Sequence, residues 1–156
     1  GIRFVYAPHL RKTYLDGAAM LMADGTPVVA LTIRFDRIDN FWHSLVHELV
    51  HVRRDLDEPG EIISDDLSIP SADSEIERRA DAEAAEALVP TDCLPPVEAM
   101  GGMDVEDLLE VAQRANVHRA IVAGRVRHAT KNWRKFARVL GNGEVRRQFE
   151  GAPAPR

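Results

Sequence analysis

Residues 43–55 read HSLVHELVHVRRD and place three histidines at four-residue intervals. Four residues make about one turn of an α-helix, so the three imidazoles would share one face. Most other positions in this stretch are apolar, which predicts a buried helix from Phe41 to Arg54, capped by Asp39 or Asn40. Imidazoles buried without partners would cost several kcal/mol. The polar face of this helix therefore needs a partner, and a divalent metal ion would serve.

The second half of this stretch contains the pattern H-E-x-x-H, formed by His47, Glu48 and His51. In this pattern two imidazoles one turn apart converge on zinc, and the glutamate between them reaches the metal-bound water. His47 and His51 are therefore the expected metal ligands and Glu48 the expected catalytic base. His43 lies about 12 Å from His51 along the axis, too far to join the same ion, and we expect it to be a second-shell neighbour.

A third ligand is expected from the Ala-rich segment that predicts a helix from Ser74 to Val89. On this helix Glu77 and Asp81 share the face that carries Ala80 and Ala84, and small alanines allow the close approach of another helix. Glu77 is therefore the expected third metal ligand. Asp81 is expected to accept the free ring N–H of a ligating histidine, as a second-shell residue.

Other assignments remain open from the residues alone. The longer pattern H-E-x-x-H-x-x-G-x-x-H would put Asp57 in the ligand position, but Arg54 stands where that pattern needs glycine. Glu77 also fits a capping box with Ser74, in which its carboxylate would only tie down the helix start. The remaining acids considered as ligands are Asp65, Asp66 and Glu75.

The expected fold class is α+β, with a small antiparallel β-sheet beside the helices. Segments rich in β-branched and aromatic residues predict its strands at residues 2–7, 17–22 and 27–33. Asp24-Gly25 predicts the turn between the last two strands, and residues 61–73 read as a loop. Three further helices are expected at residues 104–116, 118–130 and 132–140.

Length and composition predict one domain over residues 1–150 and a flexible tail over 151–156. No apolar run approaches the roughly 20 residues that a membrane span needs. The single cysteine, Cys93, cannot form an internal disulfide, which favours a reducing, cytoplasmic setting. Since the chain begins without methionine or the pattern of a signal peptide, we expect a fragment of a longer protein.

Charge is unevenly distributed along the chain. Residues 114–147 contain ten Lys or Arg against one acid, Glu144, whereas the whole chain has a net charge of −5. Such a segment can contact nucleic acid or an acidic partner, but helices with solvated arginine faces are common, and the solvated face is the simpler interpretation.

The two motifs together resemble the ImmA/IrrE family of zinc metallopeptidase-like domains. The first is HELVH, and the second is EIERRADAEAAEALVP at residues 75–90, compared with a family pattern of about E-x-x-A-[ND]-x-x-A-x-x-x-L-x-P. LDGAAML, DNFWHSLVHELVHV and HRAIVAGRVRHAT resemble the subgroup carried behind a helix-turn-helix domain in antitoxin-like regulators. Glu83 and Arg79 depart from the pattern, but neither is a proposed ligand. The matching residues of the second motif are Glu77, Ala80, Asp81, Leu88 and Pro90.

The resemblance implies a helical zincin-like core with a bound Zn ion and hydrolysis of a peptide bond in a regulatory protein. Its expected partners are a protein or peptide substrate, DNA only through a preceding helix-turn-helix domain, and a second copy of the chain. A catalytically weak metal-binding sensor and a purely structural zinc site are the alternatives. The transition-state stabiliser is open among His118, Tyr14 and Arg125, of which His118 is favoured because it begins a predicted helix.

Overall fold

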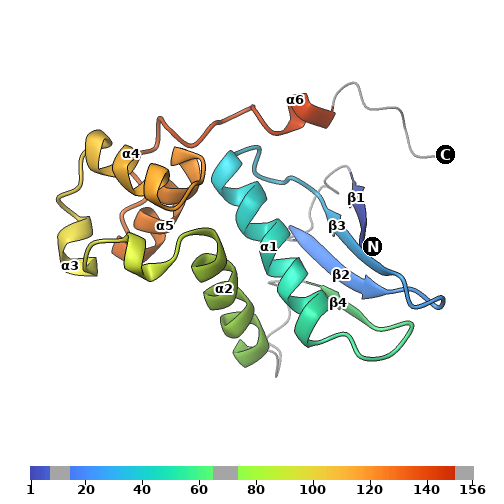
Figure 1. Cartoon of the computed structure of the whole chain (residues 1–156). Coiled ribbons are helices and arrows are strands. Elements are labelled where there is room, and N and C mark those ends of the chain that lie inside the picture. The colour runs from blue at the N-terminus through green and yellow to red at the C-terminus, as the bar shows by residue number, and fades with distance from the viewer. Residues whose placement is uncertain (8–14, 65–73, 150–156) are drawn as a thin grey trace. The chain divides into compact units, whose positions relative to one another are not determined.

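The computed structural model of this chain is an α+β fold with a four-stranded sheet (Figure 1). It describes residues 1–7, 15–64 and 74–149. Within these residues no helix is long and apolar enough to cross a membrane. The strands are β1 (Arg3–Tyr6), β2 (Gly17–Leu21), β3 (Pro27–Leu31) and β4 (Ile62–Ser64). The helices are α1 (Ile38–Arg54), α2 (Ser74–Leu88), the 3-10 helix η1 (Thr91–Cys93), α3 (Val97–Met100), α4 (Val105–Arg114), α5 (Arg119–Thr130) and α6 (Arg146–Phe149).

The sheet has the strand order β1-β3-β2-β4 and is mixed, so the expectation of a purely antiparallel sheet is wrong. β2 and β3 form the predicted antiparallel hairpin, in which Gly25 has a φ of 77° and Asp24 accepts a hydrogen bond from the Thr26 N–H. β1 pairs in parallel with the other edge of β3. The residue pattern identifies a strand, but the choice of neighbour and direction depends on which edges the other strands leave open.

The first part of the segment expected to be a loop forms β4. Its three residues pair in an antiparallel direction with β2, with Ala19 opposite Ile63. A strand this short carries too little alternation to be recognised in the sequence. Only the pairing with β2 reveals it. The rest of the expected loop, including Asp65 and Asp66, lies outside the described residues.

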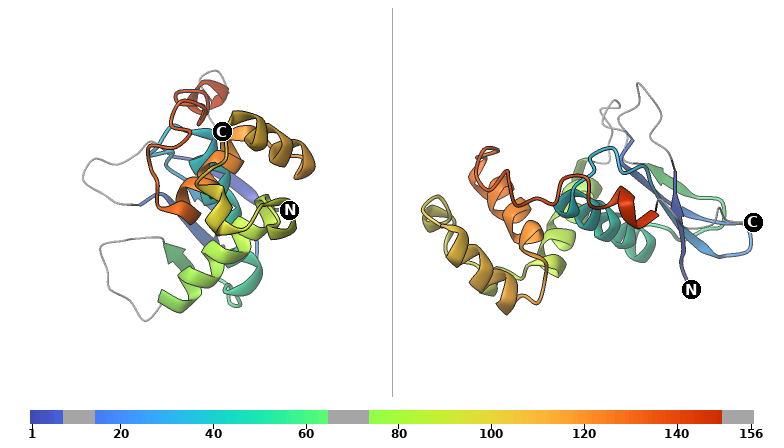
Figure 2. Two further views of the ribbon diagram at one scale, coloured as in Figure 1. Left: turned by 90° about the vertical axis from the view of Figure 1, so that its left-hand side faces the viewer. Right: turned by 90° about the horizontal axis from the view of Figure 1, so that it is seen from above.

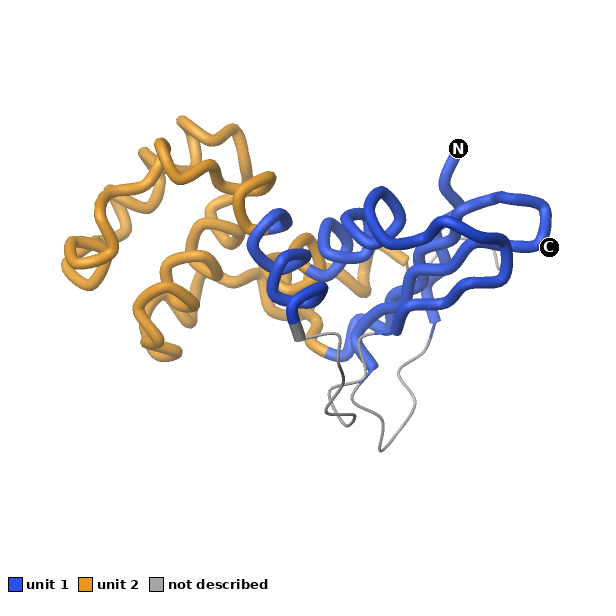
Figure 3. Tube along the Cα trace, turned by 90° about the horizontal axis from the view of Figure 1, so that it is seen from below, with its two compact units in different colours: residues 1–34, 44–84 blue, residues 35–43, 85–156 orange. Residues whose placement is uncertain are grey.

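The chain separates into two compact units (Figure 3). The first contains residues 1–34 and 44–84, and the second residues 35–43 and 85–156. In the first unit α1 runs along one face of the sheet in every view (Figures 1 and 2). Helices α1 and α2 each contribute residues to both units. The predicted single domain over residues 1–150 stays a prediction.

The second unit has its own apolar core, built mainly from α4 and α5, which lie side by side (Figure 2). Asp104 caps α4 in a capping box with Asp107, and His118 caps α5 by accepting a hydrogen bond from the Ala120 N–H. The fully buried side chains Leu108 and Val122 come from the two helices. These two helices match the expected ones to within a few residues at each end.

Two details of the second unit differ from expectation. Helix α1 begins at Ile38 rather than Phe41, and Asp39 lies inside its first turn, where it accepts two hydrogen bonds from Arg37. The helix expected over residues 132–140 is absent, and turns occupy this described segment. Asn132 accepts hydrogen bonds from two following backbone N–H groups, and Phe136 has a φ of 54°. Such local side-chain bonds and left-handed backbone interrupt a helix.

Candidate metal centre

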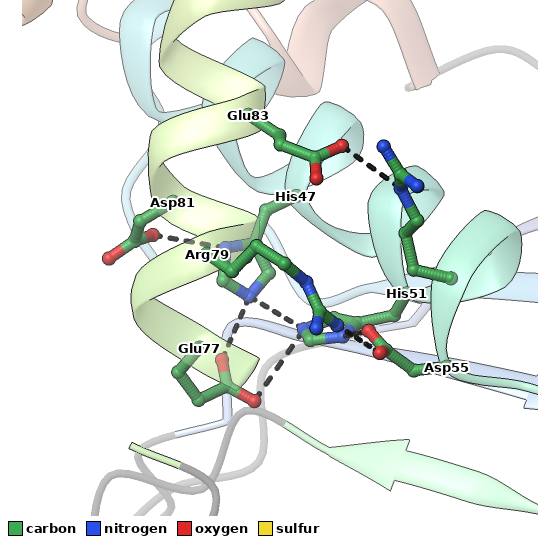
Figure 4. Close-up of polar contacts among 8 residues, drawn as sticks. His47, His51, Asp55, Glu77, Arg79, Asp81 and Glu83 are labelled. Carbon is green, nitrogen blue, oxygen red and sulfur yellow. Dashed lines mark hydrogen bonds and ion pairs between the residues drawn. The ribbon is translucent and has the colours of Figure 1, made fainter. Parts of the chain in front are cut away.

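Helices α1 and α2 bring His47, His51 and Glu77 together in the first unit (Figure 4). His47 Nε2 lies 2.9 Å from Glu77 Oε2 and 3.0 Å from His51 Nε2. His51 Nε2 lies 3.5 Å from Glu77 Oε1. Both histidines are buried, whereas the Glu77 side chain is 28% exposed. These three side chains could therefore hold a metal ion, with an approach for solvent on the side of Glu77.

The other nitrogen of each ring is held by a carboxylate. His47 Nδ1 lies 3.0 Å from Asp81 Oδ1, and His51 Nδ1 lies 2.9 Å from Asp55 Oδ2. A neutral imidazole that donates through Nδ1 has its lone pair on Nε2. The two Nε2 atoms would then face each other as acceptors beside an anionic carboxylate. Such an arrangement is repulsive unless a proton or a metal ion lies among the three atoms, so the donor set fits either of these cations.

In the metal-free centre the surrounding carboxylates favour a positive charge on the His47 ring. Burial alone would lower the pKa of His47. The hydrogen bond and charge of Asp81, together with the charges of Glu48 and Glu77, outweigh this effect and raise the pKa from 6.5 to about 9. Without metal, His47 is therefore protonated at neutral pH, and a metal ion that binds through Nε2 must displace this proton.

This pKa predicts how the stability of the metal-free protein depends on pH. Because the folded-state value of about 9 exceeds the ordinary 6.5, protonated His47 stabilises the fold fully below pH 6.5. This contribution, about 3 kcal/mol at most, is lost as the pH rises from 6.5 through 9. We expect urea unfolding of chelator-treated protein to show this loss, and His47→Gln to remove most of it. An equal pH dependence in His47→Gln would contradict the assignment to this residue.

Glu48, the expected catalytic base, lies on the side of α1 that faces the sheet. Its side chain is 1% exposed. A Cβ atom placed on Gly17, the first residue of β2, would lie 2.9 Å from both Cγ and Cδ of Glu48 and would overlap Oε1. The absence of a side chain at position 17 therefore leaves the space that the Glu48 carboxylate occupies.

We expect Gly17→Ala to displace Glu48 and to lower the free energy of unfolding by about 1–3 kcal/mol, as overpacking of a filled core does. Gly101→Ala is the matched control, because a Cβ at that position meets no atom within 4 Å and the backbone has a φ of −60°. Urea denaturation of both variants measures the difference. If the two variants were equally stable, the close approach of Gly17 and Glu48 would not exist in solution.

The other predicted site residues are placed as follows. His43 lies one turn before His47 on α1 and is half-buried, and its second-shell role stays a prediction. His43 also forms a second group with His47 and Asp81 whose ligand atoms lie close enough together to hold a metal ion, whereas Asp57 belongs to neither group among the described residues. His118 and the half-buried Arg125 belong to the second unit, where His118 caps α5. Their stabilising roles stay predictions, and Tyr14 lies outside the described residues.

Glu77 and Asp81 both direct their carboxylates to His47, as the ligand interpretation of α2 expects. The alternative in which Glu77 forms a capping box with Ser74 stays a prediction, because the Ser74 side chain lies outside the described part of the chain. The sequence interpretation missed Asp55. Its position four residues after His51 was the available signal, because residues at this spacing meet on a helix surface.

Comparisons with known proteins give no match for this chain. No protein-family model matches the chain, and no curated protein or solved structure matches it significantly. A functional assignment must therefore depend on the residues and geometry of the site.

Proposed function

We propose that this chain is a zinc-dependent metallopeptidase-like domain that hydrolyses a peptide bond of a regulatory protein. The observation that supports it most is the convergence of His47 Nε2, His51 Nε2 and the Glu77 carboxylate, with both Nδ1 atoms held by other carboxylates. Two imidazoles and one carboxylate are a ligand set of catalytic zinc, which keeps its fourth position for water. Calcium and magnesium prefer sites made of oxygen atoms.

Within this proposal each residue has a separate task. A bound zinc ion would supply a Lewis acid that lowers the pKa of its water and polarises the scissile carbonyl. Glu48 follows His47 directly in α1, and its negative charge acts on the His47 ring. Glu48 takes a proton from the attacking water and passes it to the leaving amine. The Asp81 carboxylate holds the His47 ring in the orientation that directs Nε2 toward Glu77.

The substrate class is supported by the resemblance of the two motifs to ImmA/IrrE domains. Proteins of that kind imply cleavage of a regulatory protein, or control of a partner DNA-binding domain, rather than general digestion. The domain therefore acts on few peptide sequences, and a generic protease substrate is a poor probe for it.

A second function is favoured by one observation. Glu48 is almost fully buried and lies against Gly17, so water reaches its carboxylate only if the site opens. A metal-binding sensor or interaction domain with little turnover would need no such access. The two functions share the ligands and differ in whether Glu48 exchanges a proton with water.

Chelation tests whether hydrolysis depends on the metal. The purified protein is incubated with a peptide library before and after removal of metal, and products are identified by mass spectrometry. We expect cleavage of a small set of peptides, its loss on chelation, and its return with zinc but not with magnesium. Stoichiometric zinc binding with no cleaved peptide would favour the sensor function. Cleavage that survives complete removal of metal would contradict the proposed mechanism.

A further inference from the structure

Asp55 directly follows α1 and connects the metal centre to α2. Its backbone N–H donates to the His51 carbonyl at 2.9 Å, which keeps it in the helical turn of that histidine. Its Oδ2 atom lies 2.9 Å from His51 Nδ1, and its Oδ1 atom pairs with the Arg79 guanidinium of α2 (Figure 4). The Asp55 side chain is only 8% exposed. Both carboxylate oxygens therefore have assigned partners.

We propose that Asp55 is the positioning residue of His51 and that Arg79 acts through Asp55 by holding its carboxylate in place. The inference rests on the proposed metal centre and deepens it. Asp55 does not contact the metal. It determines which nitrogen of His51 carries the proton and where the Nε2 lone pair is directed.

The argument starts from the freedom of the His51 ring. An imidazole can rotate about its ring bond and can carry its proton on either nitrogen. A carboxylate at Nδ1 selects the tautomer with a lone pair on Nε2 and increases the basicity of that nitrogen. His51 Nε2 is the atom that faces His47 and Glu77. Loss of Asp55 would therefore weaken metal binding without removing a ligand.

Arg79 restricts Asp55 in turn. An aspartate side chain has several rotamers, and the one that Asp55 adopts places Oδ2 at His51 Nδ1. The Arg79 guanidinium binds the second oxygen, which favours that rotamer. Arg79 comes from the same helix as Glu77. The pair therefore couples the packing of α2 to the orientation of a ligand on α1.

A simpler interpretation is that the ion pair between Arg79 and Asp55 only stabilises the packing of α2 on α1. The structure contains a matched control for this role, because Arg54 of α1 pairs with Glu83 of α2 at 3.3 Å. Both side chains of this second pair are partly exposed, whereas in the first pair only Arg79 is. It joins the same two helices, and within the described residues neither partner has a hydrogen bond or ion pair with His47 or His51. If both ion pairs only hold the helices together, loss of either pair should change zinc affinity equally. If Arg79 positions Asp55, only loss of the Arg79 pair should lower zinc affinity.

The experiment measures zinc affinity by competition with a chromophoric chelator in the full chain. We expect Asp55→Ala to weaken zinc binding by about 10- to 100-fold, the usual effect of losing a partner behind a ligand. Arg79→Ala should have a smaller effect, and the double variant should match Asp55→Ala because Arg79 acts only through Asp55. Asp55→Asn keeps an acceptor for Nδ1–H and should recover part of the affinity. Arg54→Ala should bind zinc like the wild type.

A second readout does not need the metal. The ¹⁵N chemical shifts of the His51 ring report its tautomer in the metal-free His47→Ala background, where no imidazole at position 47 can donate to His51 Nε2. In this background Asp55→Ala should convert the Nδ1–H form into a mixture, while Arg54→Ala leaves it unchanged. Wild-type zinc affinity and an unchanged tautomer in Asp55→Ala would overturn the inference. Equal losses of zinc affinity in Arg54→Ala and Arg79→Ala would also overturn the inference. If the wild type binds no zinc, the proposed function fails by itself, and the tautomer still decides the role of Asp55.

Discussion

Glu48→Gln is expected to lower zinc-dependent peptide hydrolysis by about 100- to 10,000-fold, the range that a general base contributes. Glutamine has nearly the same shape as glutamate but cannot accept a proton from water. It also fits the space beside Gly17, so the packing of α1 on β2 is preserved. Because Glu48 is not one of the three groups that converge on the metal position, zinc content should remain that of the wild type.

Glu83→Gln is the matched control for this variant. It makes the same chemical change on α2, at a partly exposed residue that pairs with Arg54. Its activity should stay within about twofold of the wild type, since surface ion pairs contribute little. Peptide cleavage is measured with the substrate found by the library screen. Hydrolysis that persists in Glu48→Gln would exclude Glu48 as the base, even if the metal is present.

Glu77→Ala is expected to lose zinc, with an affinity at least about 100-fold below that of the wild type. Residues behind a ligand already contribute 10- to 100-fold, and a ligand contributes more. Glu77 is the residue whose carboxylate contacts the Nε2 atoms of both histidines from α2. Without it, the two imidazoles of α1 would hold the ion alone, with too few donors for tight binding.

Metal content by mass spectrometry measures this effect, and Glu75→Ala is its control. Glu75 lies two residues earlier on α2, is exposed, and is one of the alternative ligands that the sequence leaves open. We expect Glu75→Ala to keep zinc near the stoichiometry of the wild type. Loss of zinc in Glu75→Ala with retention in Glu77→Ala would reverse the ligand assignment. Absence of zinc from the reconstituted wild type would refute the zinc-dependent function itself.

The sequence alone determined the local features of this protein. The four-residue spacing of His47 and His51, and the inward face of α2 with Glu77 and Asp81, predict side chains that the structure does bring together. The hairpin of β2 and β3 also follows from its residues and turn. These features depend on the period of a helix or strand and on residues close in the chain, so they are visible without the fold.

Only the tertiary structure decided the features that join distant segments. These include the parallel pairing of β1 with β3, the addition of β4 beside β2, and the contact of Asp55 with Arg79. In the sequence Arg79 is only a departure from a family pattern, whereas in the structure it holds a carboxylate behind His51. The free energies of such pairings depend on the positions of both partners in space, and no periodicity in one segment encodes them.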